Sequence, residues 1–273
     1  MLLDEIIRKS LEEDLGSGDI TTRYLDLEPK ICTAYMIAKA EGILAGTDVA
    51  RQVFKAVDPE LKITLYRKDG DFVAPKDEIM RVEGKPSSIL QAERTALNFL
   101  QRLSGIASQT RRMVNAMAGT STRLLDTRKT TPLLRALEKY AVRVGGGLNH
   151  RHGLYDMIML KENHIRAAGG ISAAVSRIQQ QNASYKIEVE VTNLDELEEA
   201  VAAKVDRVML DNMSIKDIKA AVKRFGKKVE LEISGGVTED NIMQYAKTGV
   251  HYISSGALTH SYKSLDISLL FKE

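Results

Sequence analysis

The stretch KIEVEVTNLDELEEAVAAKVDRVMLD, residues 186–211, contains one complete strand–helix–strand pattern. Two short runs of apolar and β-branched residues flank a segment whose apolar residues recur at helical spacing. Strands that alternate with one-sided helices are typical of parallel β/α architecture, in which each helix crosses over between neighbouring strands. This stretch therefore predicts a parallel sheet with helices packed against it.

The same pattern repeats in both directions from this unit. The other strand-like runs are TRLLD (122–126), DMIMLK (156–161), KVELEISGG (228–236) and VHYISSGAL (250–258). Six or seven such units favour an α/β barrel, complete or open, over a doubly wound sheet. A dinucleotide-binding fold is also disfavoured because no GxGxxG motif follows the first strand.

The N-terminal part of the chain has a different, mixed pattern. A helical pattern covers residues 3–15 and stops at Gly16. Short strand-like runs follow at 32–40, 62–70 and 78–84. This mixture of helices and strands predicts a separate α/β domain.

A long helical pattern over residues 88–118 has a dense apolar face, which suits a buried helix that bridges two domains. We therefore expect an N-terminal domain over residues 1–108 and a β/α domain over residues 109–262. The C-terminal tail, residues 263–273, could return to pack on the N-terminal domain.

Composition and charge limit the class of protein. The 273 residues are 44% hydrophobic and 28% charged, which is enough for a core, and the net charge is only +2. We therefore expect neither a nucleic-acid partner nor a membrane surface, and any anion site must be local. The single cysteine, Cys32, and a start without an apolar leader favour a cytoplasmic protein.

Charged and small residues stand where the predicted strands end. In a β/α barrel the active site is built at the carboxyl ends of the strands. The residues at these ends are Asp126, Thr127, Arg128, Lys129, Lys161, Glu190, Asp211, Asn212, Ser234, Gly235, Gly236, Ser254, Ser255 and Gly256. This combination of cations, acids and small turns indicates a site for a strongly anionic ligand.

Several of these groups have alternative interpretations. The SGG and SSGA turns could only permit tight loops, but we favour phosphate binding because they follow the last two strands. Glu190 and Asp211 could bind magnesium or sugar hydroxyls, whereas Asp211 could instead cap the next helix. Glu188 and Glu190 share one strand face, and two acids there do not suggest a stabilising role, because burying unpaired charge is costly.

The loop GGGLNHRHGLYD, residues 145–156, joins two predicted strands and is rich in hydrogen-bond donors. The spacing of His150, His152 and His164 matches no common metal site. We therefore interpret this loop, which also contains Arg151, as an anion-binding loop.

Three predictions concern residues outside that loop. Lys161 ends an apolar strand, where an inward-facing lysine needs an anionic partner. Arg94 lies on the predicted long helix and could be an ordinary surface arginine. Asp19 and Thr21, in a predicted turn after the first helix, are expected to act as capping groups.

A series of ordered motifs covers essentially the whole chain. They are EEDLGSGDIT, AERTALNFLQRLSGIAS, DTRKTTPLLRALEKYAV, GGGLNHRHGLYDMIMLKENHI, EVEV, MLDN, ISGG and SSGALTHS. Together they resemble the quinolinate phosphoribosyltransferase family. The resemblance implies an N-terminal α/β sandwich, an open seven-stranded α/β barrel, and assembly as a homodimer or a hexamer. It also implies that quinolinate and phosphoribosyl pyrophosphate react to give nicotinate mononucleotide, pyrophosphate and carbon dioxide, with Mg2+.

The resemblance assigns roles to individual residues. The quinolinate carboxylates would be bound by Arg128, His150, Arg151 and Lys161, together with Arg94 from the neighbouring subunit. Phosphoribosyl pyrophosphate would be bound by the catalytic residues Lys129, Glu190 and Asp211, of which Glu190 and Asp211 would also bind the metal. The phosphate-binding turns would be formed by Ser234, Gly235, Gly236, Ser255, Gly256 and Ala257. Thr127 would be a further substrate-binding residue.

Departures from the family pattern are small. Val144 stands where many relatives have cysteine, and MLKENH replaces the commoner IKDNH, but neither change removes a charged group from the pocket. One alternative is a related phosphoribosyltransferase with a different acceptor, and another is a non-catalytic phosphosugar-binding protein. The retained cations favour a dicarboxylate acceptor, and the retained acids Glu190 and Asp211 favour an enzyme.

Overall fold

The computed structural model describes residues 3–27, 30–181 and 184–272, which form two compact units. Unit 1 comprises Met1–Arg111, Thr131–Gly146 and Tyr262–Glu273, and unit 2 comprises Arg112–Thr130 and Gly147–Ser261. This division differs from the expected boundaries chiefly at residues 131–146, which cluster with unit 1.

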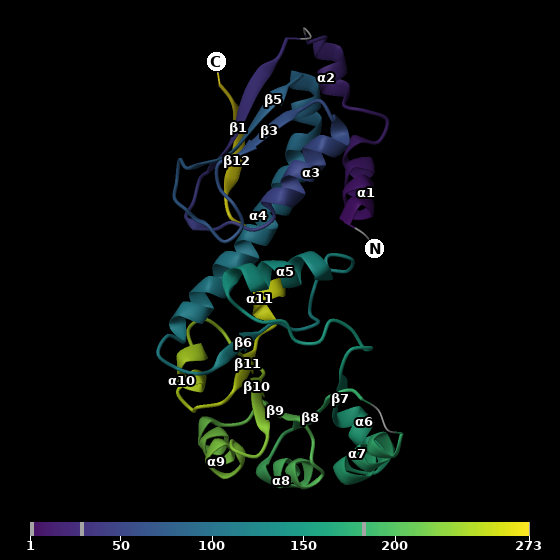
Figure 1. Cartoon of the computed structure of the whole chain (residues 1–273), viewed down its shortest axis with the longest axis vertical. Helices are drawn as coiled ribbons and strands as arrows, with labels where there is room; N and C mark the ends of the chain where they lie inside the picture. Colours follow the sequence, from purple (N-terminus) through teal and green to yellow (C-terminus); the bar gives the residue numbers. More distant parts are fainter. Residues whose placement is uncertain (1–2, 28–29, 182–183, 273) are drawn as a thin grey trace. The chain divides into compact units, whose positions relative to one another are not determined.

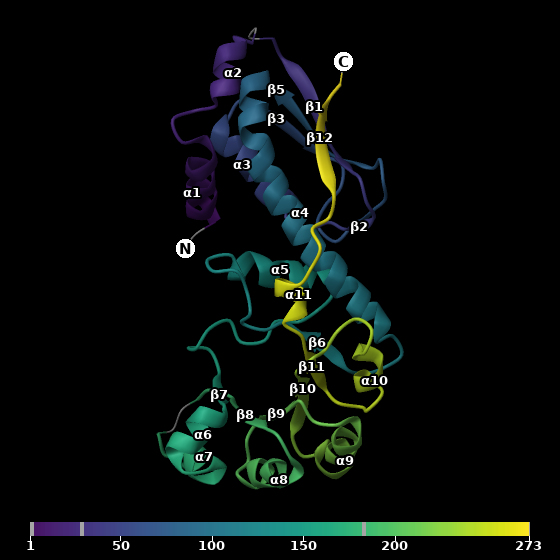
Figure 2. The same ribbon diagram turned by 180° about the vertical axis from the view of Figure 1, so that it is seen from behind.

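Unit 1 is built on a four-stranded antiparallel sheet in the order β12-β1-β5-β3. These strands are β1 (Cys32–Ala38), β3 (Lys62–Leu65), β5 (Glu78–Gly84) and β12 (Ile267–Phe271), and a small second sheet pairs β2 (Gly42–Ile43) with β4 (Phe72–Val73). The C-terminal strand β12 runs beside β1, and its Leu269 pairs with the fully buried Met36 (Figures 1 and 2). The tail is thus part of the core of unit 1.

The helices of unit 1 are α1 (Leu3–Leu15), α2 (Ile20–Leu25), α3 (Thr47–Val57) and α5 (Arg135–Gly145), while α4 (Pro86–Ala116) begins in unit 1 and ends in unit 2. The predicted long helix is therefore confirmed. Asp19 is the N-cap of α2 and accepts a hydrogen bond from the Thr22 N–H at 3.2 Å, whereas Thr21 lies inside the helix. None of the described helices could cross a membrane, because none is both long and apolar enough.

Unit 2 contains a six-stranded parallel sheet in the order β6-β11-β10-β9-β8-β7. The strands are β6 (Arg123–Leu125), β7 (Ile158–Leu160), β8 (Ile187–Val191), β9 (Arg207–Asp211), β10 (Glu230–Ser234) and β11 (Tyr252–Ser254). Beside β6, Leu148 makes an isolated parallel bridge with Leu125. The open parallel α/β sheet is confirmed, but the described residues form six strands and one bridge where seven strands were expected.

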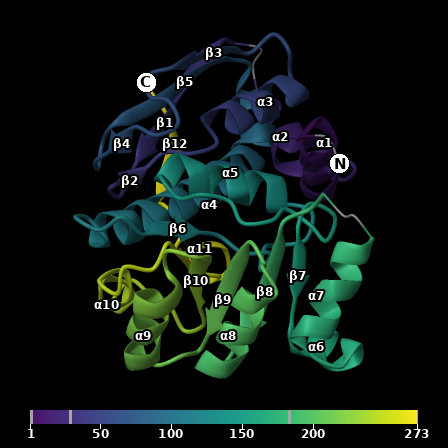
Figure 3. The ribbon, with the colours of Figure 1, turned by 60° about the horizontal axis from the view of Figure 1, so that its bottom comes forward.

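Helices α6 (Glu162–Ala168), α7 (Ile171–Gln180), α8 (Leu194–Ala202) and α9 (Ile215–Phe225) lie on one face of this sheet (Figure 3), and α10 (Ile242–Ala246) and α11 (Ala257–His260) follow the last strands. The strand residues on the helix-covered face are apolar and fully buried, as Val189, Val208 and Leu231 show. Because side chains alternate along a strand, the intervening residues point to the opposite face. That face carries the candidate site.

Candidate active site

Except for Arg94, the predicted site residues line a single cleft of about 960 Å³ in unit 2. They are Thr127, Arg128, Lys129, His150, Arg151, Lys161, Glu190, Asp211, Ser234, Gly235, Gly236, Ser255, Gly256 and Ala257. These residues lie at the carboxyl ends of the parallel strands or in the loops that follow them. Arg94 is exposed on α4 in unit 1 and is absent from the described lining of the cleft.

The strand register brings residues from neighbouring strands together at the cleft. Glu190 on β8 pairs with Met209 on β9, and Asp211 pairs with Ser234 on β10. Paired residues of parallel strands point to the same face, so these side chains lie next to one another. The parallel register thus gathers groups that are far apart in sequence.

The turn after β10 is shaped for close approach of a ligand to the backbone. Gly235 and Gly236 have φ of +99° and +59°, a region that favours glycine. A Cβ atom on Gly235 would lie only 2.1 Å from Oδ1 of Asn212. The Asn241 side chain fixes the turn by donating to the Gly236 carbonyl and accepting from the Thr238 N–H, both at 2.8 Å. Turns of this kind can present N–H groups to a phosphate.

The turn after β11 packs directly against Lys129. A Cβ atom on Gly256 would lie 2.8 Å from Cδ of Lys129 and 2.9 Å from Nε2 of His260. The Thr259 hydroxyl donates to the Lys129 carbonyl at 2.7 Å and so fixes the backbone of this lysine. The small residue at position 256 therefore leaves room for the stem of Lys129, which suits a lysine that binds a phosphate beside this turn.

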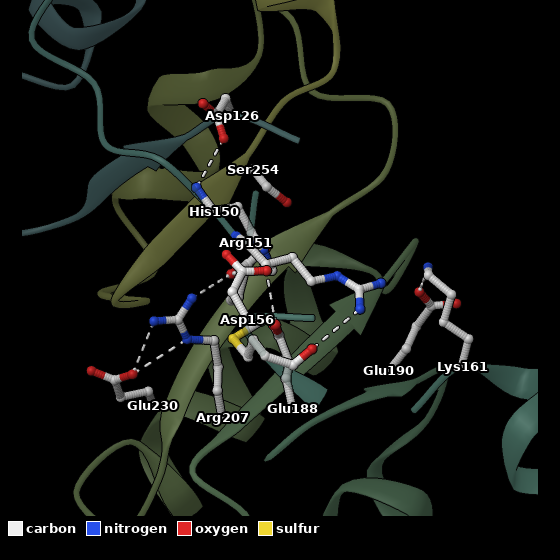
Figure 4. A network of polar contacts seen from close by, with 12 residues as sticks. Asp126, His150, Arg151, Asp156, Lys161, Glu188, Glu190, Arg207, Glu230 and Ser254 are labelled. Atoms are coloured by element: carbon white, nitrogen blue, oxygen red, sulfur yellow. Dashed lines mark hydrogen bonds and ion pairs between the residues drawn. The ribbon is translucent and has the colours of Figure 1, made fainter. Parts of the chain in front are cut away.

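Three further cations face the cleft: Arg128, Arg151 and Lys161. Burial lowers the pKa of Arg151, and the positive charge of Arg128 lowers it further. The Arg151 side chain extends toward Lys161 and Glu190 (Figure 4). Crowded cations repel one another in the absence of a ligand, and an acceptor with two carboxylates would relieve that repulsion.

Glu190 and Asp211 supply negative charge to the same cleft. Glu190 forms an ion pair with Lys161, and burial, followed by the charge of Glu190, raises the pKa of Asp211. Two carboxylates close enough to repel each other fit Mg2+, which prefers oxygen ligands. Asp211 does not cap the following helix, because α9 has Ser214 as its N-cap, with Oγ accepting from the Asp217 N–H.

A buried cluster of charged groups lies two residues earlier along the same strands. Glu188 and Glu232 are both 0% exposed. The Nε2 atom of His150 lies 3.0 Å from Oε2 of Glu188 and 3.5 Å from Oε2 of Glu232. Burial raises the pKa of each glutamate to about 7, and the charge of Glu188 contributes to the shift of Glu232.

His150 lines the cleft, but its ring nitrogens both face groups of the protein. Nδ1 accepts the backbone N–H of Arg151 at 2.7 Å, while Nε2 faces the two buried glutamates. The side chain is only 5% exposed. In this arrangement neither nitrogen points to a ligand, so direct contact of His150 with a substrate carboxylate stays a prediction.

Comparison with known proteins places this site in a family. The profile described as the N-terminal domain of quinolinate phosphoribosyl transferase matches residues 19–104, and the profile of the C-terminal domain matches residues 106–270. The chain belongs to the quinolinate phosphoribosyltransferase family. The two profiles together span almost the whole sequence, and the cleft lies in the part matched by the C-terminal one.

Individual members of the family are similar over nearly their full length. The structure of the nicotinate-nucleotide pyrophosphorylase from Francisella tularensis has 47% sequence identity and a TM-score of 0.96, covering 99% of this chain and 96% of that one. A probable nicotinate-nucleotide pyrophosphorylase (carboxylating) from Bacillus subtilis is 42% identical, and the match covers 98% of this chain and 92% of the relative. The chloroplastic nicotinate-nucleotide pyrophosphorylase (carboxylating) of Arabidopsis thaliana is 43% identical, and the match covers 98% of this chain and 82% of the relative.

Sequence reasoning missed two members of the buried cluster, Glu232 and Arg207. Arg207 contacts Glu232 at 3.1 Å and Glu230 at 3.1 Å. A signal was available, because Glu232 precedes Ser234 by two residues just as Glu188 precedes Glu190, so each acid shares a strand face with a strand-end residue. Which acids lie next to each other depends on how neighbouring strands pair, and this register cannot be read from the sequence of one strand alone.

Replacing Glu232 with glutamine should change how stability depends on pH. The pKa of Glu232 is raised from its ordinary value of 4.5 to about 7, so between these values the folded protein retains a proton that the unfolded chain has lost. The contribution of Glu232 to the free energy of unfolding therefore falls as pH rises through this window. Glutamine does not titrate, so Tm of the variant minus Tm of the wild type should increase from about pH 5 to about pH 8. A difference that is constant with pH would contradict the assignment.

Replacing Gly235 with alanine should weaken binding of a phosphorylated ligand. The new Cβ would displace the Asn212 side chain, which now donates to Asp211 at 2.9 Å. The matched control is Gly249→Ala, at a glycine with φ of +81° whose added Cβ would find its nearest neighbour at 3.7 Å. Both variants should lose about 1–2 kcal/mol of stability from backbone strain, but only Gly235→Ala should raise KM for the phosphorylated substrate. Equal kinetic effects would refute the role of this turn.

Proposed function

We propose that the chain transfers the phosphoribosyl group of phosphoribosyl pyrophosphate to quinolinate, giving nicotinate mononucleotide, pyrophosphate and carbon dioxide, in de novo NAD biosynthesis. The observation that carries this proposal is the composition of one cleft. It combines cations suited to two carboxylates with glycine turns suited to phosphates and a pair of acids suited to a metal. The names of the relatives agree with this combination.

The acceptor side of the proposed site is formed by Arg128, Arg151 and Lys161. The planar fork of arginine can bind a carboxylate through two parallel hydrogen bonds, and a lysine adds a point charge. Quinolinate has two adjacent carboxylates, so a site in which Arg128 and Arg151 repel each other without ligand suits it well. Thr127 and His150 complete this side of the lining.

The donor side contains Lys129, Glu190 and Asp211 together with the two turns, Ser234–Gly236 and Ser255–Ala257. Lys129 stands beside the second turn, where it would neutralise phosphate charge. Glu190 and Asp211 would hold Mg2+, which supplies charge neutralisation of the departing pyrophosphate when bound. The pair has the oxygen donors that this cation requires.

The residues of the cleft suit both bond changes of the reaction. The ring nitrogen of quinolinate forms a bond to the anomeric carbon while the bond from that carbon to pyrophosphate breaks, and the carboxylates of Glu190 and Asp211 favour the positive charge that develops on the sugar. The carboxylate beside the ring nitrogen then leaves as carbon dioxide, its bonding electrons remain on the ring carbon next to the cationic nitrogen, and that carbon takes up a proton. No organic cofactor is required.

We further propose that the active unit is a homodimer or a hexamer in which Arg94 enters the acceptor site of the neighbouring subunit. Arg94 is exposed, stands on a helix of unit 1, and is not among the described residues that line the cleft. A further cation from a second copy would complete the set that binds two carboxylates.

The proposed activity is tested by incubating the purified protein with quinolinate, phosphoribosyl pyrophosphate and Mg2+. Nicotinate mononucleotide should form in step with release of carbon dioxide, and removal of Mg2+ with a chelator should stop the reaction until the metal is restored. Turnover of nicotinate without turnover of quinolinate would instead show a related transferase with a different acceptor.

The shared site predicts complementation between two inactive variants. Arg94→Ala and Lys161→Ala should each be nearly inactive, because each removes one cation from every acceptor site. Mixed dimers contain one site that lacks both residues and one site that lacks neither, so part of the activity should return after unfolding and refolding the two variants together. If activity stays at the level of the separate variants, each site is built from a single chain.

A further inference from the structure

A buried cluster contains Glu188, Glu232, His150, Arg207 and Asp126, and apart from His150, which lines the cleft, its members have no place in the reaction as proposed above. Glu188, Glu232 and Asp126 are each 0% exposed, so they cannot contact a ligand in the cleft directly. Figure 4 shows the side chains of His150, Glu188 and Arg207 close to Arg151, with Asp126 next to His150. Any effect of the cluster on the cleft therefore passes through His150 and its neighbours.

The contacts of His150 fix the position of its proton. Nδ1 accepts the Arg151 N–H at 2.7 Å, so this nitrogen presents a lone pair and the proton of the neutral ring is on Nε2. Nε2 faces Oε2 of Glu188 at 3.0 Å and Oε2 of Glu232 at 3.5 Å. An ionised carboxylate only accepts, so the negative charge carried by this pair of glutamates favours the tautomer that the Arg151 amide requires.

The backbone of His150 is fixed as well. Its N–H donates to Oδ1 of Asp126 at 2.8 Å, and the Asn149 side chain donates to Oδ2 of the same carboxylate at 2.6 Å. Asp126 directly follows β6 and stands two residues before Arg128. One buried network thus anchors the segments that carry two of the cleft arginines.

Residues of neighbouring strands fix the positions of the glutamates in this network. Arg207 on β9 contacts Glu232 at 3.1 Å and Glu230 at 3.1 Å, and its guanidinium carbon lies 4.1 Å from the centre of the Tyr252 ring. These contacts join β8, β9, β10 and β11 to the His150 ring. The described His150, Glu188 and Glu232 are also near enough to hold a metal ion, but Arg207 already supplies positive charge at Glu232, so we assign the two glutamates an electrostatic role toward the imidazole.

We propose that Glu188 and Glu232 are positioning residues for the acceptor: through the tautomer of His150 they fix the backbone of Arg151, so that its guanidinium is already oriented for a substrate carboxylate. This inference rests on the proposed acceptor side of the cleft. An arginine has many rotamers, and ordering it before the ligand arrives lowers the entropic cost of binding. Burying two carboxylates is costly for stability, so their position suggests a benefit in function instead.

Substitution by glutamine tests this directly. A glutamine amide can donate to Nε2 and so stabilise the other tautomer, whose Nδ1–H would oppose the Arg151 N–H. Glu188→Gln should raise KM for the dicarboxylate acceptor by about 10- to 100-fold, as small misplacements of binding groups do, with the donor KM changed by less than about 2-fold. Glu232→Gln, at the longer distance, should have a smaller effect. The matched control is Glu230→Gln, which also contacts Arg207 but not His150 and should leave the acceptor KM unchanged.

A double-mutant cycle separates this role from a general loss of packing. In His150→Asn the amide oxygen can replace Nδ1 as the acceptor for the Arg151 N–H, while the shorter side chain no longer reaches the glutamates. Adding Glu188→Gln to this variant should cause little further change in acceptor KM. If Glu188→Gln has the same effect in both backgrounds, its influence does not pass through His150 and the proposal fails.

The tautomer itself can be measured without any substrate. Nitrogen-15 NMR of the labelled protein should show a protonated Nε2 and an unprotonated Nδ1 for His150 in the wild type, with the balance shifted in Glu188→Gln. The opposite tautomer in the wild type would overturn the inference even if no variant could be studied. Because this readout needs no turnover, it remains valid if quinolinate proves not to be the acceptor.

Discussion

The two-residue period of the parallel strands is the constraint on which the site depends. On β8 and β9 it turns Val189 and Val208 toward the helices, where both are fully buried, and turns Glu188 and Arg207 to the opposite face. Barrel interiors are ordinarily filled with branched apolar residues. Here one face of the sheet supplies the apolar contacts, which leaves the other free to carry charge.

Burying such a charged layer is tolerable only when its oppositely charged groups lie close enough to compensate the loss of hydration. Arg207 is shared between Glu230 and Glu232 and stacks over Tyr252, while His150 joins Glu188 to the loop above. A partly satisfied buried network is worse than an apolar core, so each member restricts its neighbours to one geometry. The same restriction gives the cleft a defined shape, since its lining begins two residues further along the same strands.

The features predicted from the sequence are those that local patterns determine. Strand and helix periodicity located the long helix α4 and all six parallel strands. Because active sites of β/α barrels form at the carboxyl ends of the strands, the strand ends also predicted that Lys161, Glu190 and Asp211 share one cleft. Residues 131–146 cluster with unit 1 although the expected boundary assigned them to the β/α domain, and the described residues form six parallel strands and a bridge at Leu148 where the family resemblance implied seven strands. Both features depend on tertiary packing, which local patterns do not encode. The contacts of His150 depend on register between distant strands, which no local pattern encodes.

The adjacency of Arg128 and Lys129 has a geometric consequence for the proposed reaction. The loop that carries them begins at the buried Asp126, is braced where the Thr127 hydroxyl accepts the Lys129 N–H at 3.0 Å, and is held at its far side by the hydroxyl of Thr259. In the proposed reaction one cation would serve the acceptor and the next the donor, so a single braced turn would set the distance between the two substrates. Small errors in such a distance cost large factors in rate, and a short loop fixed at both ends limits those errors better than two independent segments could.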